Sequence, residues 1–296
     1  MSEVNSLLKK SKGLKANYID QTKFDISLFK GDLAEKASKI IPKMFMSIQK
    51  ARKDYKKEMK NPSGEIQDAP PEFWNEIIEY ASTLGVGLIG FAPIDENLIF
   101  ENDYVGGIEF LYENGIVLGM EMDSEAINWA PDPPAGLESL RIYAELGEAT
   151  NKLADFIRSK GFRAIACHPL GGPILYPAMA VKTNLGEIGR QGLLITKKFG
   201  PRQRLSLIAV NAGQLPQRKV EKFEITNYCK KCRRCLALCP VKAIKEEPIV
   251  NENGTITRID SEKCFEYFYK TTGCSVCIET CPFHRIGYQA LYYRQI

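Results

Sequence analysis

The chain has 296 residues, of which 44% are hydrophobic and 26% are charged, a balance that excludes a disordered or fibrous protein. At roughly 150 residues per domain, this length predicts two domains, or one large domain with a small one appended. No apolar run approaches the ~18–20 residues that a membrane span needs, and no secretory signal is recognisable, so we expect a cytoplasmic protein. The formal net charge of +4 is compatible with weak nucleic-acid binding.

The predicted elements alternate between helices and short apolar strands. Residues 32–60 have a helical pattern that we expect to be interrupted at Pro42, and a linker then leads to a second helix over 73–84. A long helix over 136–160 ends at Gly161, the place of a C-cap glycine. Buried strands are expected at the apolar runs 86–91, 116–120, 163–167 and 205–210. This alternation predicts an α/β or α+β body with a covered sheet.

Eight of the 9 cysteines lie between Cys229 and Cys281, and their spacing predicts two iron–sulfur clusters. The first run has the spacing C-x2-C-x2-C-x3-C before a proline, which is the 4Fe-4S ligation pattern of bacterial ferredoxins. A second set repeats the end of this run, and a displaced cysteine substitutes for its first member. The two sets are Cys229, Cys232, Cys235 and Cys239, followed by Cys264, Cys274, Cys277 and Cys281.

In two-cluster ferredoxins, the fourth cysteine of a run ligates the other cluster. The crossed assignment therefore gives one cluster to Cys229, Cys232, Cys235 and Cys281, and the other to Cys239, Cys264, Cys274 and Cys277. Disulfides are disfavoured in a chain without a signal peptide, and zinc sites usually have paired C-x2-C units. The remaining Cys167 is interpreted as a small buried side chain. Roughly 220 residues precede these cysteines, so we expect the body to use the electrons.

Segments of the body and of the cysteine region resemble two enzyme families. The body segments IVLGMEMD, FIRSKGFRAIAC and LGEIGRQGLLITKKFGPRQR, which begin at residues 116, 156 and 185, are similar to the reductive dehalogenases. The segments KCFEYFYK and GCSVCIETCPFHR, which begin at residues 263 and 273, are similar to the epoxyqueuosine reductases. Both families bind cobalamin beside two 4Fe-4S clusters. The resemblance covers about residues 73–286 and is closer to the dehalogenases.

The resemblance implies a fold of class α+β with three parts. An N-terminal helical extension spans residues 1–65, and a nitroreductase-like, cobalamin-binding catalytic body spans residues 66–222. A bacterial-ferredoxin-like module with two clusters spans residues 223–296.

The resemblance also implies a cobalamin site in the glycine-rich segment, although glycines three residues apart can simply mark close packing. Neither His168 nor His284 lies in a D-x-H-x-x-G stretch, so we expect a base-off corrinoid without a histidine ligand. The residues expected to bind the cofactor are Gly186, Glu187, Gly189, Arg190, Gly192, Leu193, Leu194, Ile195, Thr196, Phe199 and Gly200.

We expect catalytic roles for three residues, either because the resemblance implies them or because of their position in the predicted fold. Tyr143 matches the tyrosine that donates the proton in the dehalogenases, and Arg202 falls near the place of its cationic partner, with Arg204 as the alternative. A core aromatic is the alternative interpretation of Tyr143, which shares a helical face with Gly147. His168 ends a predicted strand, where ligand pockets collect, and is a candidate for the pocket.

The implied function is that of an oxygen-sensitive oxidoreductase. An external ferredoxin or flavodoxin reduces the clusters, the clusters reduce cobalamin, and a carbon–halogen bond of a small organohalide is cleaved. The first alternative is epoxide reduction in a tRNA base, which is disfavoured because residues 168–171, HPLG, lack the family's aspartate. The second alternative is a corrinoid or electron carrier without turnover. No oligomeric state is predicted.

Cluster binding changes the meaning of the net charge. Iron binding deprotonates the thiols, and two clusters with their thiolates contribute about −4. The holoprotein is therefore close to neutral, and its basic residues do not indicate nucleic acid. Five basic side chains around the first run are expected to face a negative cluster or an acidic electron donor, namely Lys230, Lys231, Arg233, Arg234 and Lys242.

Overall fold

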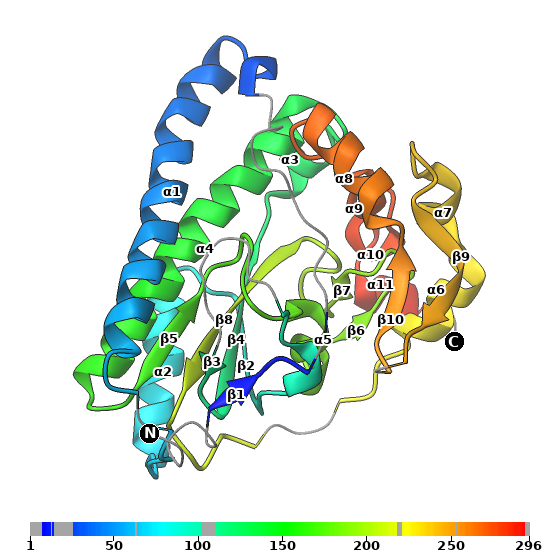
Figure 1. The fold of residues 1–296 in the computed structure, drawn as a ribbon. Coiled ribbons are helices and arrows are strands. Elements are labelled where there is room, and N and C mark those ends of the chain that lie inside the picture. The colour runs from blue at the N-terminus through cyan, green and yellow to red at the C-terminus, as the bar shows by residue number, and fades with distance from the viewer. Residues whose placement is uncertain are drawn as a thin grey trace.

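The computed structural model describes residues 8–12, 14, 26–62, 64–101, 110–217, 221–252 and 254–293 (Figure 1). Most of the first 25 residues, where a secretory signal would be sought, lie outside these ranges. Within them, no helix combines the length and the apolar character needed to cross a bilayer.

The body is built on a four-stranded antiparallel sheet with the strand order β2-β4-β8-β5. Side chains of successive residues alternate between its two faces, so Ile116 and Leu118 of β4 enter one apolar core while Val117 enters the other. Both faces are covered, which confirms the predicted α+β fold. The strands are β2 (Leu88–Pro93), β4 (Asn114–Glu121), β5 (Ala164–Cys167) and β8 (Gln203–Val210).

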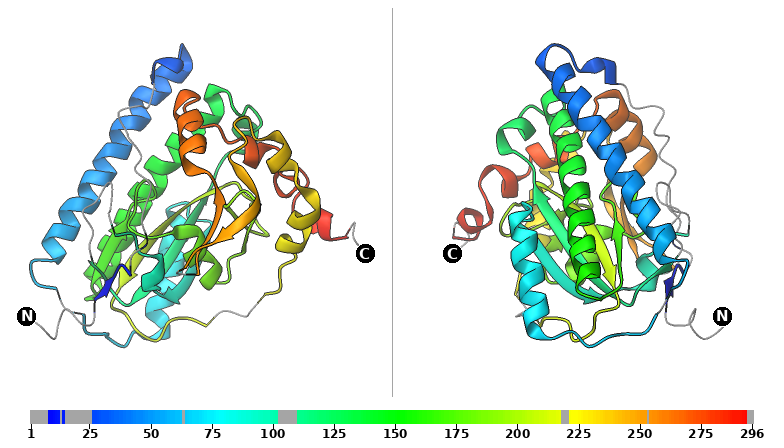
Figure 2. Two further views of the ribbon diagram at one scale, coloured as in Figure 1. Left: turned by 45° about the vertical axis from the view of Figure 1, so that its right-hand side comes forward. Right: turned by 90° about the vertical axis from the view of Figure 1, so that its left-hand side faces the viewer.

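Three helices lie side by side over one face of this sheet (Figure 2). They are α1 (Asp32–Glu58), α2 (Pro71–Thr83) and α4 (Pro133–Ser159), while α5 (Tyr176–Lys182) packs on the other face. As predicted, α4 ends before Gly161, which has a φ of 93°. Short elements complete the body: η3 (Ile26–Leu28), η4 (Glu96–Leu98), α3 (Ser124–Ile127), and β1 (Lys9–Lys10) paired with β3 (Phe110–Leu111).

The predicted interruption at Pro42 is wrong, because α1 runs through this residue as one helix. Its buried residues Met44 and Ile48 share an apolar cluster with Leu140 and Ala144 of α4. A proline inside a helix costs about 3 kcal/mol, and burial of these side chains offsets that cost.

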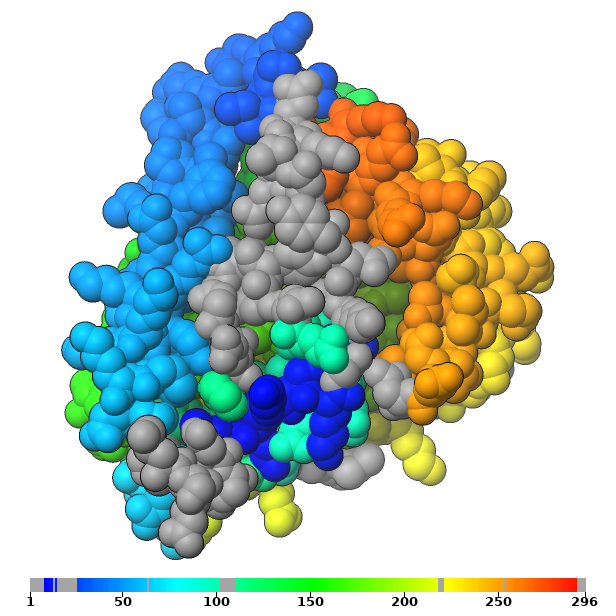
Figure 3. All heavy atoms as spheres, viewed as in Figure 1, coloured from blue at the N-terminus to red at the C-terminus, as the bar shows by residue number. Residues whose placement is uncertain are grey.

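The C-terminal part forms a separate group of elements beside the body. Its elements are α6 (Ile225–Cys232), α7 (Arg234–Leu238), a hairpin of β9 (Ile244–Val250) and β10 (Ile256–Ile259), α8 (Ser261–Lys270), α9 (Val276–Glu279), α10 (Pro282–Arg285) and α11 (Tyr288–Tyr293). In the space-filling view, α1 and this part form the two sides of one face (Figure 3). The boundaries proposed for the three parts stay a prediction.

Two glycines of the body allow the C-terminal part to approach closely. A Cβ on Gly136, at the start of α4, would lie 2.2 Å from the carbonyl oxygen of Thr272. A Cβ on Gly200 would lie 2.3 Å from the carbonyl oxygen of Phe283, and Gly200 also has a φ of 58°. Backbone lies against backbone at both points, so only glycine fits without a shift of the interface.

Candidate iron–sulfur and catalytic site

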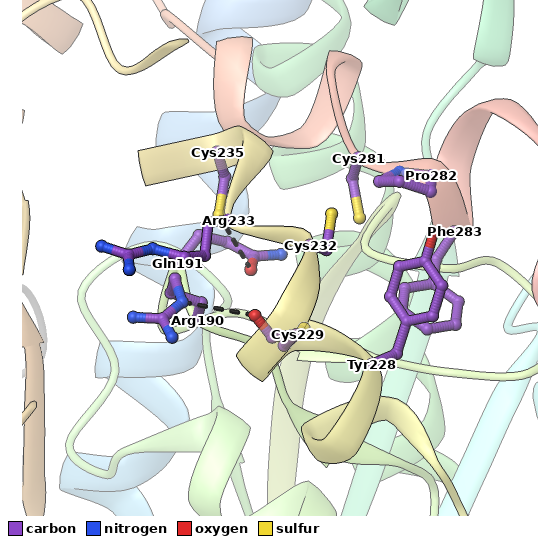
Figure 4. Close-up of a pocket in the computed structure, with 10 residues that line it drawn as sticks. All are labelled: Arg190, Gln191, Tyr228, Cys229, Cys232, Arg233, Cys235, Cys281, Pro282 and Phe283. Carbon is purple, nitrogen blue, oxygen red and sulfur yellow. Dashed lines mark hydrogen bonds between the residues drawn. The ribbon is translucent and has the colours of Figure 1, made fainter. Parts of the chain in front are cut away.

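Four cysteines surround one cavity in the C-terminal part (Figure 4). Cys229 and Cys232 lie on α6, Cys235 lies on α7, and Cys281 immediately precedes α10. The sulfur atoms of Cys232, Cys235 and Cys281 point toward the space between them (Figure 4). Arg233, in the left-handed conformation with a φ of 54°, turns the chain sharply between the two helices. This turn lets three nearby cysteines face one cavity.

The other four cysteines form a second group. Cys264 lies on α8, Cys277 on α9, Cys274 just before α9, and Cys239 just after α7. Burial, and then the proximity of Cys274 and Cys239, raises the pKa of Cys264 to about 11. Burial also raises the pKa of Cys277, with further contributions from Cys264 and Cys274, then from Cys235 of the first group, and then from Cys239. The first set of the crossed assignment lines one cavity and the other four cysteines lie beside it, and the assignment of ligands to two clusters stays a prediction.

The thiols of the first group are enclosed by the protein. In the first group, burial is the main cause that raises the pKa of Cys235 to about 11 and that of Cys281 to about 12. Such thiols stay protonated at neutral pH unless a metal displaces the proton.

All eight candidate donors are cysteine thiols, which are the ligands of iron–sulfur clusters. Among the residues that the structure describes, no three His, Cys, Asp or Glu side chains converge closely enough to hold one metal ion. A zinc site needs four ligands at about 2.0–2.3 Å, whereas a cubane takes one thiolate at each of its four irons and needs a wider space. The donor type and arrangement therefore fit two 4Fe-4S clusters.

The glycine-rich segment forms a hairpin of β6 (Glu187–Ile188) and β7 (Leu194–Ile195). Gly192 donates its N–H to the carbonyl oxygen of Gly189 at 3.0 Å and has a φ of 79°, so Arg190 and Gln191 are the central residues of a tight turn. A Cβ on Gly186 would lie 2.1 Å from a backbone oxygen of the opposite strand. These glycines are therefore used for packing and turning within the protein, and the turn reaches the first cysteine cavity.

The rest of that segment also makes contacts within the protein. The Glu187 carboxylate accepts a hydrogen bond from the N–H of Thr226 on α6 at 2.8 Å. Thr196 and Gly200 exchange backbone hydrogen bonds of 2.9 and 3.0 Å, which closes a tight loop. The apolar members Leu194, Ile195 and Phe199 are buried, and Leu193 packs against the main core. The segment thus joins the body to the cysteine-containing part, and its contact with cobalamin stays a prediction.

Tyr143 lies on α4 beside an arginine of the sheet. The Cζ atom of Arg204, on β8, is 4.8 Å from the centre of the Tyr143 ring, which is cation–π geometry. Arg204 also donates from Nη2 to the Oγ atom of Ser139 at 2.8 Å, and Ser139 is one turn before Tyr143 on α4. The structure therefore pairs Tyr143 with the alternative cation, Arg204.

Arg202 points elsewhere. Its Nη1 atom donates to Glu121 Oε1 at 2.6 Å and to the carbonyl oxygen of Met122 at 3.0 Å, at the end of β4. The positive charge of Arg202 also contributes, after burial, to lowering the pKa of His284 to about 4. The His284 Nε2 atom is 2.9 Å from Asn128 Oδ1, which places the body and the C-terminal part in polar contact here.

His168 is enclosed between α1 and β5, where both ring nitrogens are occupied. Leu170 donates its N–H to Nδ1 at 3.0 Å, so Nε2 carries the proton and donates to the Oγ atom of Ser47 at 2.8 Å. Ser47 in turn donates to the carbonyl oxygen of Met44 at 2.7 Å. Burial lowers the pKa of His168 to about 4, so the ring is neutral at physiological pH. These contacts tie α1 to the body.

Two residues that the sequence analysis did not single out lie in the candidate site: one contacts Arg204, and the other lines the first cysteine cavity. Ser139 holds Arg204, but nothing in its local sequence distinguishes it from another small residue of a buried helix face. Gln191 lines the first cysteine cavity. The only sequence signal for Gln191 was its place between Gly189 and Gly192, which favours a turn there.

The cysteine region and the whole chain both resemble known proteins. Residues 228–286 match the family model of the 4Fe-4S dicluster domain. The chain is 32% identical over 243 residues to a tetrachloroethene reductive dehalogenase of Desulfitobacterium hafniense, an alignment that covers 78% of this chain and 42% of the relative. This chain is a homologue of the reductive dehalogenases. An epoxyqueuosine reductase of Atelocyanobacterium thalassa is 26% identical over 149 residues, which cover 47% of each chain. The predicted resemblance is thus confirmed.

Solved structures of reductive dehalogenases share the fold. A catabolic reductive dehalogenase in complex with 3-bromo-4-hydroxybenzoic acid superposes with a TM-score of 0.71 at 17% identity, covering 94% of this chain and 43% of that chain. A second one, for which a mechanism of B12-dependent dehalogenation is suggested, gives 0.63 at 24% identity, covering 71% and 31%. This chain therefore spans less than half the length of the dehalogenases it matches.

Proposed function

We propose that this chain is a reductase of the reductive dehalogenase type, which uses two 4Fe-4S clusters and base-off cobalamin to cleave a carbon–halogen bond of a small organohalide. The observation that carries the proposal is the pairing of Tyr143 with Arg204 near the cysteine-containing part. Tyr143 lies about two helical turns after Gly136, the point at which α4 touches that part. The proposed proton donor thus lies on the helix that touches the cysteine-containing part, roughly 10 Å along its axis from that contact.

Each residue of this pair has a defined chemical task. Replacing a halogen by hydrogen consumes two electrons and one proton and releases halide. The Tyr143 hydroxyl supplies the proton to carbon, and the Arg204 guanidinium over the ring stabilises the phenolate that is left. Ser139 fixes the guanidinium through its hydroxyl, so it is a positioning residue. Bound cobalamin would supply the low-potential electron transfer to the substrate that side chains cannot provide.

Buried groups of the body and of the C-terminal part would suit a polar cofactor. Several buried polar atoms there have no hydrogen-bond partner among the described residues. Orphaned polar atoms are costly unless a ligand or water pairs with them, and a corrin carries many amide groups. These atoms are Arg202 Nε and Arg204 Nε of the body, and Ser275 Oγ, Thr280 Oγ1 and His284 Nδ1 of the C-terminal part. They would hold the corrin together with the glycine-rich segment.

Anaerobic reconstitution with iron, sulfide and cobalamin tests the proposal. We expect about eight irons per chain, a base-off cobalamin EPR signal, and halide release from members of a panel of aryl and alkyl halides. Eight irons without a cobalamin signal would leave an electron carrier and overturn the catalytic proposal. Specific tRNA binding with a steep salt dependence, in the absence of halide release, would favour the epoxyqueuosine reductase alternative instead.

The electron donor of this function is proposed to be an acidic ferredoxin or flavodoxin that docks on α6 and α7. These helices lie at the edge of the molecule farthest from α1 (Figure 1). Residues 225–243 contain five basic and no acidic side chains, and all five are exposed, as is Leu238, which is 51% exposed. Cys232 and Cys235 are half-buried on the same helices. A negatively charged donor on this face would therefore stand close to the first cluster.

Charge reversal tests this docking face. The double substitution Lys231→Glu and Arg234→Glu should slow cluster reduction by an acidic ferredoxin about tenfold or more at low salt, because it removes electrostatic steering. Stopped-flow absorbance measures the rate, and Lys36→Glu with Lys43→Glu on α1 is the matched control. Reduction by photoreduced deazaflavin, a small neutral reductant, should be unchanged. An equal slowing with deazaflavin would show that these side chains only balance the cluster charge.

A further inference from the structure

Gln191 of the β6–β7 turn reaches from the body into the cavity of the first cysteine group (Figure 4). The residue is 3% exposed, and its Oε1 atom is 4.0 Å from the Sγ atom of Cys235. Among the described residues, Gln191 is the only glutamine that lines this cavity. Its neighbour Arg190 lines the cavity too, and binds the C-terminal part through the carbonyl oxygen of Glu246 at 2.7 Å.

The local backbone is built to leave room for this amide. A Cβ on Gly189 would lie 2.5 Å from Gln191 Oε1, so a side chain there would displace the amide from its present position. Gly192, with a φ of 79°, then turns the chain back into β7. The two glycines therefore explain both how the turn closes and why the side chain of Gln191 can lie across it.

One end of the Gln191 side-chain amide lacks a hydrogen-bond partner among the described residues. Gln191 Nε2 is buried and has no hydrogen-bond partner among the described residues. Its oxygen faces a thiol, which can donate a weak hydrogen bond, but a metal-bound thiolate is an acceptor only. A half-turn of the terminal torsion exchanges the amide nitrogen and oxygen without moving the rest of the side chain. Loss of the thiol proton therefore favours the orientation in which Nε2 donates toward sulfur.

We propose that Gln191 donates an amide hydrogen bond to a sulfur of the first 4Fe-4S cluster and thereby raises the reduction potential of that cluster. The reduced cluster carries one more negative charge than the oxidised one, so a buried donor stabilises it more. The donor comes from the body, so docking of the cysteine-containing part against the body sets the potential at which electrons enter. This inference rests on the cluster part of the proposed function and does not depend on the substrate.

The substitution Gln191→Met keeps the length of the side chain and removes the donor. We expect the equilibrium constant for one-electron reduction of the first cluster to fall about tenfold, a shift of about 59 mV to lower potential. An EPR-monitored redox titration of the reconstituted holoprotein measures it, with the second cluster as an internal reference. Gln49→Met makes the same chemical change at an exposed position on α1, outside the cavity, so it is the matched control and should leave both potentials unchanged.

A measurement on the unmutated chain covers the case in which Gln191→Met loses iron. With the glutamine side-chain amides labelled with 15N, pulsed EPR of the reduced first cluster should show a 15N hyperfine coupling. Absence of that coupling, or an unchanged potential in a Gln191→Met protein with full iron content, would overturn the proposal. Both readouts are independent of halide release, so they separate this inference from failure of the proposed reaction.

Discussion

The substitution Tyr143→Phe should lower kcat for halide release by about 10²–10⁴-fold and leave iron content and cobalamin binding unchanged. The reason is that phenylalanine keeps the ring beneath Arg204 but has no proton to give. Steady-state halide release under anaerobic conditions measures the effect, and iron analysis with visible spectra checks that the holoprotein is intact.

Two comparisons make this result specific. Tyr80→Phe is the matched control, because Tyr80 is half-buried on α2 with its ring against Phe156, outside the contacts of Arg204. Turnover unaffected by Tyr143→Phe would exclude Tyr143 as the proton donor. The same assay separates the two arginines: because Arg204 contacts the ring and Arg202 bonds Glu121, Arg204→Lys should lower kcat more than Arg202→Lys.

The substitution Cys264→Ala should remove the second cluster and lower the iron content from about eight to about four per chain. Cys264 is the one proposed ligand that stands outside a C-x2-C or C-x3-C unit, but α8 places it beside Cys274 and Cys239. Three remaining thiols leave one iron of a cubane without a protein ligand, so the cluster is expected to be lost or degraded during purification. Iron analysis and EPR of the reduced protein measure the loss.

Cys167→Ala is the matched control for this experiment. Cys167 is fully buried on β5 in the body core, far along the chain from the other cysteines, and its replacement should leave the iron content unchanged. Retention of about eight irons in Cys264→Ala would place the fourth ligand of the second cluster elsewhere. A loss of iron in Cys167→Ala would instead contradict the crossed assignment, which leaves this residue unused.

Local sequence was sufficient for features that depend on short-range chemistry. The apolar runs predicted as strands contain β2, β4, β5 and β8 or overlap them, because each is buried on both faces of the sheet. Gly161 marked the end of α4, since a residue with positive φ is required there. Pro42 misled the prediction because tertiary packing of α1 on α4 outweighs a local preference.

The amino-acid sequence by itself determined which side chains can hold clusters, since the spacing of the cysteines limits which thiols a short loop can present together. Only the tertiary structure decided how distant residues meet. It places Arg204 rather than Arg202 against Tyr143, encloses His168 under α1, and directs Gln191 into the first cysteine cavity. These contacts join residues that are far apart in the chain. They depend on strand register, helix packing and turn geometry, which a local sequence pattern does not encode.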